Sequence, residues 1–182
     1  MTFPPPAIRI LLALLVVIAA AVDIRQRRIP NWLTLSGVVL AIALNTFLYE
    51  LDGLWLACKG LGLAFAVYFA LYLLRGMGAG DVKLMAAVGA TAGPLNWLGI
   101  LVLTSVAGAL AGLALVAIKG RMRSTFRNLY LILMSLRRGR APYQDHPEID
   151  VGSAEGVRLP HAVMIALGTL GFLAAGAIWA PR

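Results

Sequence analysis

Long uninterrupted apolar runs dominate the 182-residue sequence. A helical run of about 20 apolar residues matches the hydrocarbon thickness of a lipid bilayer, and a small soluble domain could not bury so many such runs. Only 13% of the residues are charged and the mean hydropathy is +0.85, which excludes an ordinary water-soluble globule. We therefore predict an all-α, polytopic membrane protein.

The apolar runs give six candidate transmembrane helices, at residues 8–22, 33–49, 54–74, 82–92, 98–118 and 159–180. The fourth is short, because a helix over residues 81–92 rises only about 18 Å, whereas the hydrocarbon core is about 30 Å thick. Short connections without basic residues separate the second span from the third, at 50–53, and the fourth span from the fifth, at 93–97. We interpret residues 1–182 as a single transmembrane domain.

Basic residues are concentrated in alternate loops. Thirteen of the sixteen Lys and Arg residues lie in loops 23–32, 75–83 and 119–158, and such residues are retained in the cytoplasm. We therefore predict that these loops are cytoplasmic and that both termini lie outside. The first run also has features of a secretory signal, but export would carry Arg25, Arg27 and Arg28 outside. Topology explains the net charge of +8, so we expect membrane lipids and no nucleic acid as partners.

The loop 119–158 has two parts. Residues 126–136 are apolar but too few to span, and we predict an interfacial helix there. The remainder is rich in Gly, Pro and acidic residues; His146 lies beside three acids, without the spacing of a metal site. Cys58 is the only cysteine, which excludes an internal disulfide and a cysteine zinc module. We expect no metal and no other cofactor.

Two aspartates lie at the predicted cytoplasmic boundary. Asp23 ends the first span, and Asp81 follows Gly78-Ala79-Gly80 directly before the short span. Asp81 would then lie partly inside the membrane, where an ionisable group indicates a function. We expect Gly78 and Gly80 to adopt backbone conformations closed to other residues and to let a helix approach closely. The structural alternative is that each aspartate is a helix cap or a topology marker.

Two carboxyl groups in a partly desolvated site favour aspartic-protease chemistry. Like charges close together cannot both ionise cheaply, so one carboxyl keeps a proton while the other acts as a base. The base takes a proton from water, and the acid donates a proton to the scissile carbonyl. A transporter that relays ions or protons through the two carboxylates is the alternative, and would show a polar stripe along several spans.

The motifs resemble those of the type IV prepilin peptidases, a family of intramembrane aspartic proteases with a Gly-x-Gly-Asp signature. Residues 78–84, with Lys83, match that signature, and Asp23 with Ile29-Pro30-Asn31 resembles the first-aspartate motif. The resemblance implies removal of basic leader peptides from prepilins or pseudopilins at the cytoplasmic face of the bacterial inner membrane. It also implies these site residues: catalytic Asp23 and Asp81, supported by Gly78, Gly80 and Lys83.

The chain departs from this family in two ways. Larger members carry an amino-terminal domain with paired cysteines for methylation, whereas here the first span begins at once and Cys58 is alone. The chain thus resembles the short, peptidase-only branch associated with tight-adherence pili, and we expect no methyltransferase activity. Near the last span, relatives often have Pro-Tyr-Gly or Pro-Phe-Gly, and this chain has Pro160-His161-Ala162, so His161 replaces the aromatic residue. The cognate prepilin and the oligomeric state stay open.

Overall fold

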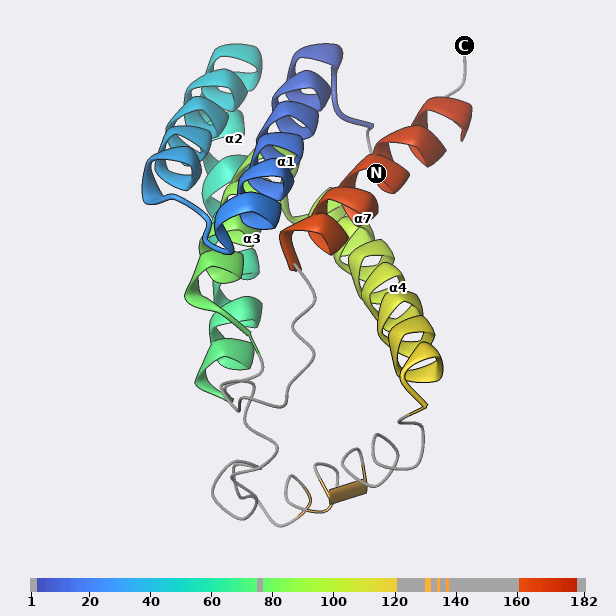
Figure 1. Ribbon diagram of the computed structural model, residues 1–182. Helices are drawn as coiled ribbons and strands as arrows, with labels where there is room; N and C mark the ends of the chain where they lie inside the picture. The colour runs from blue at the N-terminus through green and yellow to red at the C-terminus, as the bar shows by residue number, and fades with distance from the viewer. Residues whose placement is uncertain are drawn as a thin grey trace.

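The computed structural model describes residues 3–74, 77–120 and 161–179, with single positions at 130, 131, 134 and 137. Its regular elements there are all helices, as predicted: α1 (Pro6–Gln26), α2 (Asn31–Leu73), α3 (Ala79–Ala92), α4 (Pro94–Ile118) and α7 (His161–Trp179) (Figure 1). Four of these, all except α3, are long and apolar enough to cross a membrane. Composition and helix length therefore agree with a membrane protein.

Helix α2 is 43 residues long and reverses direction at Glu50, whose φ of 55° and ψ of −136° are not helical. Asn45 and Gly60, on either side of this kink, both contact the end of α3, although they would lie about 22 Å apart in a straight helix. We call residues 31–49 the first arm and residues 51–73 the second arm. The reversal is so tight that a Cβ at Gly53 would meet the carbonyl of Asn45.

Two predicted connections are shorter than expected. The connection expected at 50–53 is a kink within α2, and the predicted spans 33–49 and 54–74 form its two arms. The connection expected at 93–97 is reduced to Gly93, with φ of 75°, because Pro94 already begins α4. Proline is well suited to a first helical position, where its missing N–H has no partner to lose.

Helix α3 is the buried centre of the bundle. Every residue from 81 to 92 is buried except Lys83, and most of its packing is against α2. Gly89 and Gly60 lie so close that a Cβ on either would meet the carbonyl of the other. Small residues at helix contacts are typical of membrane proteins, because close packing there replaces the missing hydrophobic driving force.

The side chain of Asn45 caps the end of α3. Its buried amide nitrogen donates to the carbonyl oxygens of Ala90 at 3.3 Å, Thr91 at 3.4 Å and Ala41 at 2.9 Å. Carbonyls in the last turn of a helix lack intrahelical partners, and Pro94 has no N–H to donate to Ala90. An unsatisfied carbonyl is costly at membrane depth, so Asn45 fixes the end of α3 against the first arm.

The outer surface is apolar. Phe47, Ile118 and Ile178 are each at least 80% exposed. Of α4, only Trp97, Ile100 and Thr104 are buried, and its far half extends away from α1 and α2 (Figure 1). Exposed apolar side chains on this scale are unfavourable in water and favourable in lipid.

The remaining predicted elements have two outcomes. Helices α1, α3, α4 and α7 coincide, apart from a few terminal residues, with the predicted spans 8–22, 82–92, 98–118 and 159–180. The interfacial helix predicted at 126–136, and most of the loop 119–158 around it, lie outside the described residues. Within residues 126–136 only positions 130, 131 and 134 are described, and they are helical.

We predict that Gly60→Ala destabilises the fold by about 1–3 kcal/mol, the usual cost of overpacking. The new Cβ would meet the carbonyl of Gly89 and lie 3.0 Å from the Cα of Gly93. Gly62→Ala on the same arm is the matched control, because a Cβ there has nothing within 4 Å. The measurement is the thermal unfolding midpoint in detergent, and equal midpoints would contradict the close packing of α2 on α3.

Candidate active site

Asp23 lies in the last turn of α1, where the chain turns towards α2. The helix ends because Arg27 adopts the left-handed conformation, with φ of 51° and ψ of 32°. The Arg27 N–H donates to the Asp23 carbonyl oxygen at 2.8 Å, which closes this turn. Pro30 then precedes α2 as its N-cap residue. The side chain of Asp23 is half-buried at this end of the bundle.

Asp81 lies in the first turn of α3 and is only 8% exposed. The N-cap residue is Gly78, and no side chain makes a capping hydrogen bond there. The alternative that Asp81 is the N-cap is therefore wrong. A carboxylate in the first turn interacts favourably with the helix dipole, but that interaction does not require burial.

The expectation for the two glycines is only half right. Neither Gly78, with φ of −81°, nor Gly80, inside α3, has a positive φ, so neither needs a conformation closed to other residues. Gly80 instead provides space, because a Cβ there would lie 3.3 Å from the Cβ of Ile29. The absence of a side chain at 80 lets the turn between α1 and α2 lie against α3.

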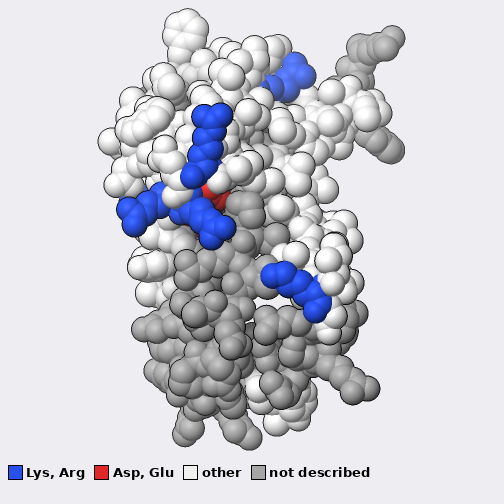
Figure 2. All heavy atoms as spheres, in the orientation of Figure 1, with Lys and Arg blue, Asp and Glu red and all other residues white. Residues whose placement is uncertain are grey.

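Asp23 and Asp81 line the same cavity, which has a volume of about 500 Å³. On the face drawn in Figure 2, a small acidic patch lies among Lys and Arg side chains. The walls come from the end of α1, the turn that follows and the start of α3: Asp23, Gln26, Arg27, Arg28, Ile29, Pro30, Asn31, Gly78, Gly80, Asp81 and Lys83. The fold thus brings all five predicted site residues to one cavity.

Lys83 connects the two motifs. Its Nζ donates to the Oδ1 of Asn31 at 2.9 Å, joining α3 to the start of α2. The side chain is exposed, so this bond is worth little as a source of stability, but it fixes the orientation of the Asn31 amide at the cavity. The described contact of Lys83 is therefore with Asn31, a residue of the first-aspartate motif.

The start of α7 also reaches the aspartates. The Ala162 N–H donates to the Oδ2 of Asp23 at 3.4 Å, and His161 lies within electrostatic range of Asp81. Tyr68, a buried residue of the second arm of α2, also interacts electrostatically with Asp81. Its ring lies edge-on to that of Trp97, with 6.3 Å between the ring centroids.

Sequence reasoning did not assign these neighbours to the site. The available signal for His161 was its place at the start of a span that follows a basic loop, which predicts the same membrane face as the aspartates. Tyr68 lies within an apolar run, and no motif distinguishes it.

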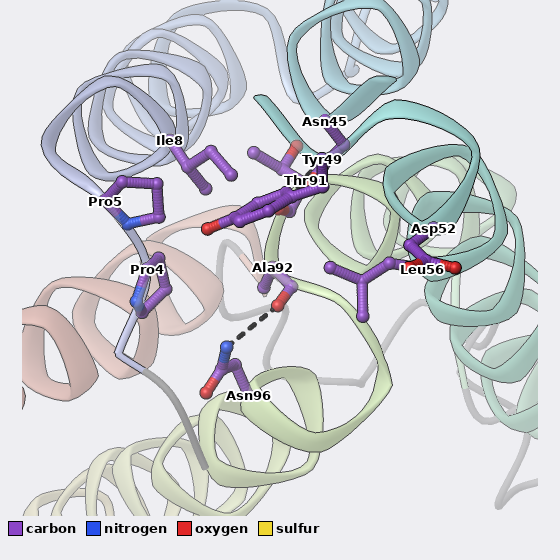
Figure 3. A pocket seen from close by; sticks show the side chains of 10 residues that line it. All are labelled: Pro4, Pro5, Ile8, Asn45, Tyr49, Asp52, Leu56, Thr91, Ala92 and Asn96. Atoms are coloured by element: carbon purple, nitrogen blue, oxygen red, sulfur yellow. Dashed lines mark hydrogen bonds between the residues drawn. The ribbon is translucent and has the colours of Figure 1, made fainter. Parts of the chain in front are cut away.

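A second cavity, of about 220 Å³, lies at the opposite ends of α1 and α3 (Figure 3). It contains one carboxylate, Asp52, and the amide of Asn96, which donates to the carbonyl of Ala92 at 3.0 Å. A single carboxylate cannot serve as both acid and base, so this cavity does not offer the same chemistry. Across the described residues, no group of three or more His, Cys, Asp or Glu side chains is placed to hold a metal ion.

The chain is similar to known proteins over the region that contains both aspartates. Residues 10–113, more than half of the chain, match the model of the type IV leader peptidase family. Three curated relatives are each named "Prepilin leader peptidase/N-methyltransferase". The relative from Legionella pneumophila is 34% identical over 122 residues, or 63% of this chain. That from Xanthomonas campestris pv. campestris is 32% identical over 127 residues, or 64% of this chain.

The third relative, from Aeromonas hydrophila, is 32% identical over 127 residues, or 63% of this chain. Each alignment covers 42% of the relative, so the chain spans about two fifths of the length of these proteins. No solved structure matches the chain.

Proposed function

The chain belongs to the type IV leader peptidase family, and on this basis we propose that it is an intramembrane aspartic endopeptidase. The observation that carries the mechanism is the shared cavity of Asp23 and Asp81. Our proposed substrates are prepilin-like proteins, because the curated relatives are named as prepilin leader peptidases. The whole of residues 1–182 would form one peptidase domain.

In the proposed reaction the two carboxyls share one proton. The ionised carboxyl removes a proton from a water molecule, whose oxygen attacks the carbonyl carbon of the scissile peptide. The protonated carboxyl donates its proton to the carbonyl oxygen, giving a tetrahedral intermediate. The carboxyl that took the proton from water then donates it to the peptide nitrogen, and the C–N bond breaks. As the carbonyl re-forms, a hydroxyl of the intermediate gives its proton to the other carboxylate, so the pair again holds one proton. Burial of Asp81 supports this scheme, because a low dielectric makes the doubly ionised pair costly.

We propose that the site opens at the cytoplasmic face of the bacterial inner membrane. The alternation of basic loops supports cytoplasmic placement of Asp23 and Asp81 and external termini, with six membrane spans if each arm of α2 crosses once. The shortness of α3 supports it too: its 14 residues rise about 21 Å, so its start lies below the surface of a bilayer. Labelling of a cysteine at position 145 from outside intact cells would contradict this topology.

We limit the proposal to leader removal. The relatives' names include N-methyltransferase, but the shared region is two fifths of their length, and Cys58 is the single cysteine of the 182 residues. The purified chain should therefore release a product with an unmethylated amino terminus. Transfer of label from S-adenosylmethionine to that product would contradict this limit.

We predict that Asp23→Asn and Asp81→Asn each reduce cleavage by about 10³-fold or more, because neither carboxyl can act as acid and base alone. The double variant should be no worse than either single variant, since each change already removes the whole mechanism. The measurement is mass spectrometry of the new amino terminus of a prepilin after incubation with the purified chain.

Asp52→Asn is the matched control for this experiment, because Asp52 lines the cavity at the far ends of α1 and α3. We expect it to cleave at nearly the wild-type rate. Lys83→Met should cost less than either aspartate change, since Lys83 acts through Asn31. Substantial turnover by Asp81→Asn would refute the aspartic mechanism and favour the transporter alternative.

A further inference from the structure

The hydrogen bond between Lys83 and Asn31 orients a side-chain amide at the cavity of the aspartate pair. The Lys83 Nζ lies 2.9 Å from the Asn31 Oδ1, and both residues line the cavity with Asp23 and Asp81. Lysine can only donate, so the atom of Asn31 that faces it must be the oxygen. The amide nitrogen Nδ2 therefore lies on the other side of the carboxamide. Among the described residues, none accepts a hydrogen bond from Nδ2.

The backbone at Asn31 is held in place by the start of α2. Pro30 precedes it with φ of −67°, and the Pro30 carbonyl accepts hydrogen bonds from the N–H groups of Leu33 at 3.2 Å and Thr34 at 3.5 Å. The Thr34 hydroxyl donates to the Asn31 carbonyl oxygen at 3.1 Å, and Leu33 and Thr34 are both buried. The backbone and Lys83 together thus fix where the amide lies.

The other polar side chains that line this cavity from the end of α1 are less constrained. Gln26, Arg27 and Arg28 are exposed, and within the described part of the chain their side chains make no hydrogen bond. A side chain that rotates freely loses conformational entropy when it binds a partner. The Asn31 amide has already lost much of that freedom, so it is the best pre-organised of these donors.

Asn31 lies to one side of the aspartate pair. Lys83 comes two residues after Asp81 in α3, so the two side chains leave the helix about 200° apart. Their burial agrees with this, because Asp81 is 8% exposed and Lys83 is fully exposed in class. Asn31 contacts Lys83, so its amide lies on the Lys83 side of the cavity. This position suits a group next to the reacting carbonyl better than the reacting carbonyl itself.

A peptide substrate would bring groups that need such a donor. A peptide bond held in a helix has its carbonyl engaged in the helix, so the segment must unwind before water can attack it. Unwinding leaves backbone carbonyls without partners, which is costly in a partly desolvated site. A neutral side-chain amide can satisfy one of these carbonyls without adding a charge beside the two carboxyls.

We propose that the Asn31 amide donates a hydrogen bond to a backbone carbonyl of the substrate next to the scissile peptide bond, and that Lys83 is the positioning residue that orients the amide. This inference rests on the proposed peptidase function and adds a substrate contact to its site. The bound carbonyl does not react, so the contact is equally strong in the ground state and the transition state. Its loss should raise KM and leave kcat nearly unchanged.

The test is the kinetics of the full chain in detergent, with synthetic peptides that carry a basic leader before an apolar segment. In each peptide one backbone carbonyl near the scissile bond is replaced by a thioamide, which is a weaker acceptor. We expect one position at which the thioamide raises KM of the wild type about fivefold. Asn31→Asp keeps an oxygen for Lys83 but has no N–H to donate, so the same thioamide should leave its KM unchanged.

A second comparison tests the role of Lys83. Lys83→Met should raise KM for the unmodified peptide, because the amide is then free to rotate. In an Asn31→Ala background the same change should add nothing, since Lys83 acts through Asn31. The matched control is Lys59→Met, which changes an exposed lysine of the second arm that does not line the cavity and should keep wild-type kinetics.

The outcomes separate this inference from the proposed function. If the wild type cleaves no peptide, the peptidase function fails and the inference fails with it. If the wild type cleaves but no thioamide raises KM, or if Asn31→Asp responds to it equally, Asn31 is only structural. A fall in kcat with KM unchanged would contradict the proposed carbonyl. Should Asn31→Asp not fold, Asn31→Ala must show the same loss of response to the thioamide, or the inference is wrong.

Discussion

The burial of α3 between the two arms of α2 is the contact on which the rest of the structure depends. Paired glycines at 60 and 89 let the backbones meet, and the Asn45 amide satisfies carbonyls that α3 leaves open at its end. Since α3 is only 14 residues long, fixing one end also fixes the other. The position of Asp81 in the bundle follows from this arrangement.

The candidate site is assembled from helix ends on one side of the bundle. The end of α1 supplies Asp23, the start of α3 supplies Asp81, and the start of α7 approaches both. Helix ends are suited to this task, because the first turn of a helix has free N–H groups and a positive dipole end that interact favourably with carboxylates. The opposite ends of α1 and α3 enclose a cavity with a single carboxylate, Asp52, so the two faces of the protein differ in their chemistry.

The sequence predicted the helices well and displays the two motifs directly, because both are strong local signals. Apolar runs have a length set by the bilayer, and Gly78-Ala79-Gly80-Asp81 is a compact motif. The sequence predicted a break between the two arms near Glu50, but not that a single non-helical residue would make the reversal, because both arms continue as helix up to it. Of the two reasons given for Gly78 and Gly80, the special backbone conformation was wrong. Close approach holds for Gly80, which provides space for Ile29, a residue about fifty positions earlier.

Docking of α3 brings Asp81 to Asp23 in the folded protein. The most direct test of this arrangement is cross-linking of Asp23→Cys/Asp81→Cys, in a Cys58→Ser background, with a short bifunctional thiol reagent. We predict one intramolecular cross-link in this variant and none in Asp23→Cys/Asp52→Cys, whose positions lie at opposite ends of the bundle. Failure of the first variant to cross-link, while each cysteine reacts singly, would contradict the shared site.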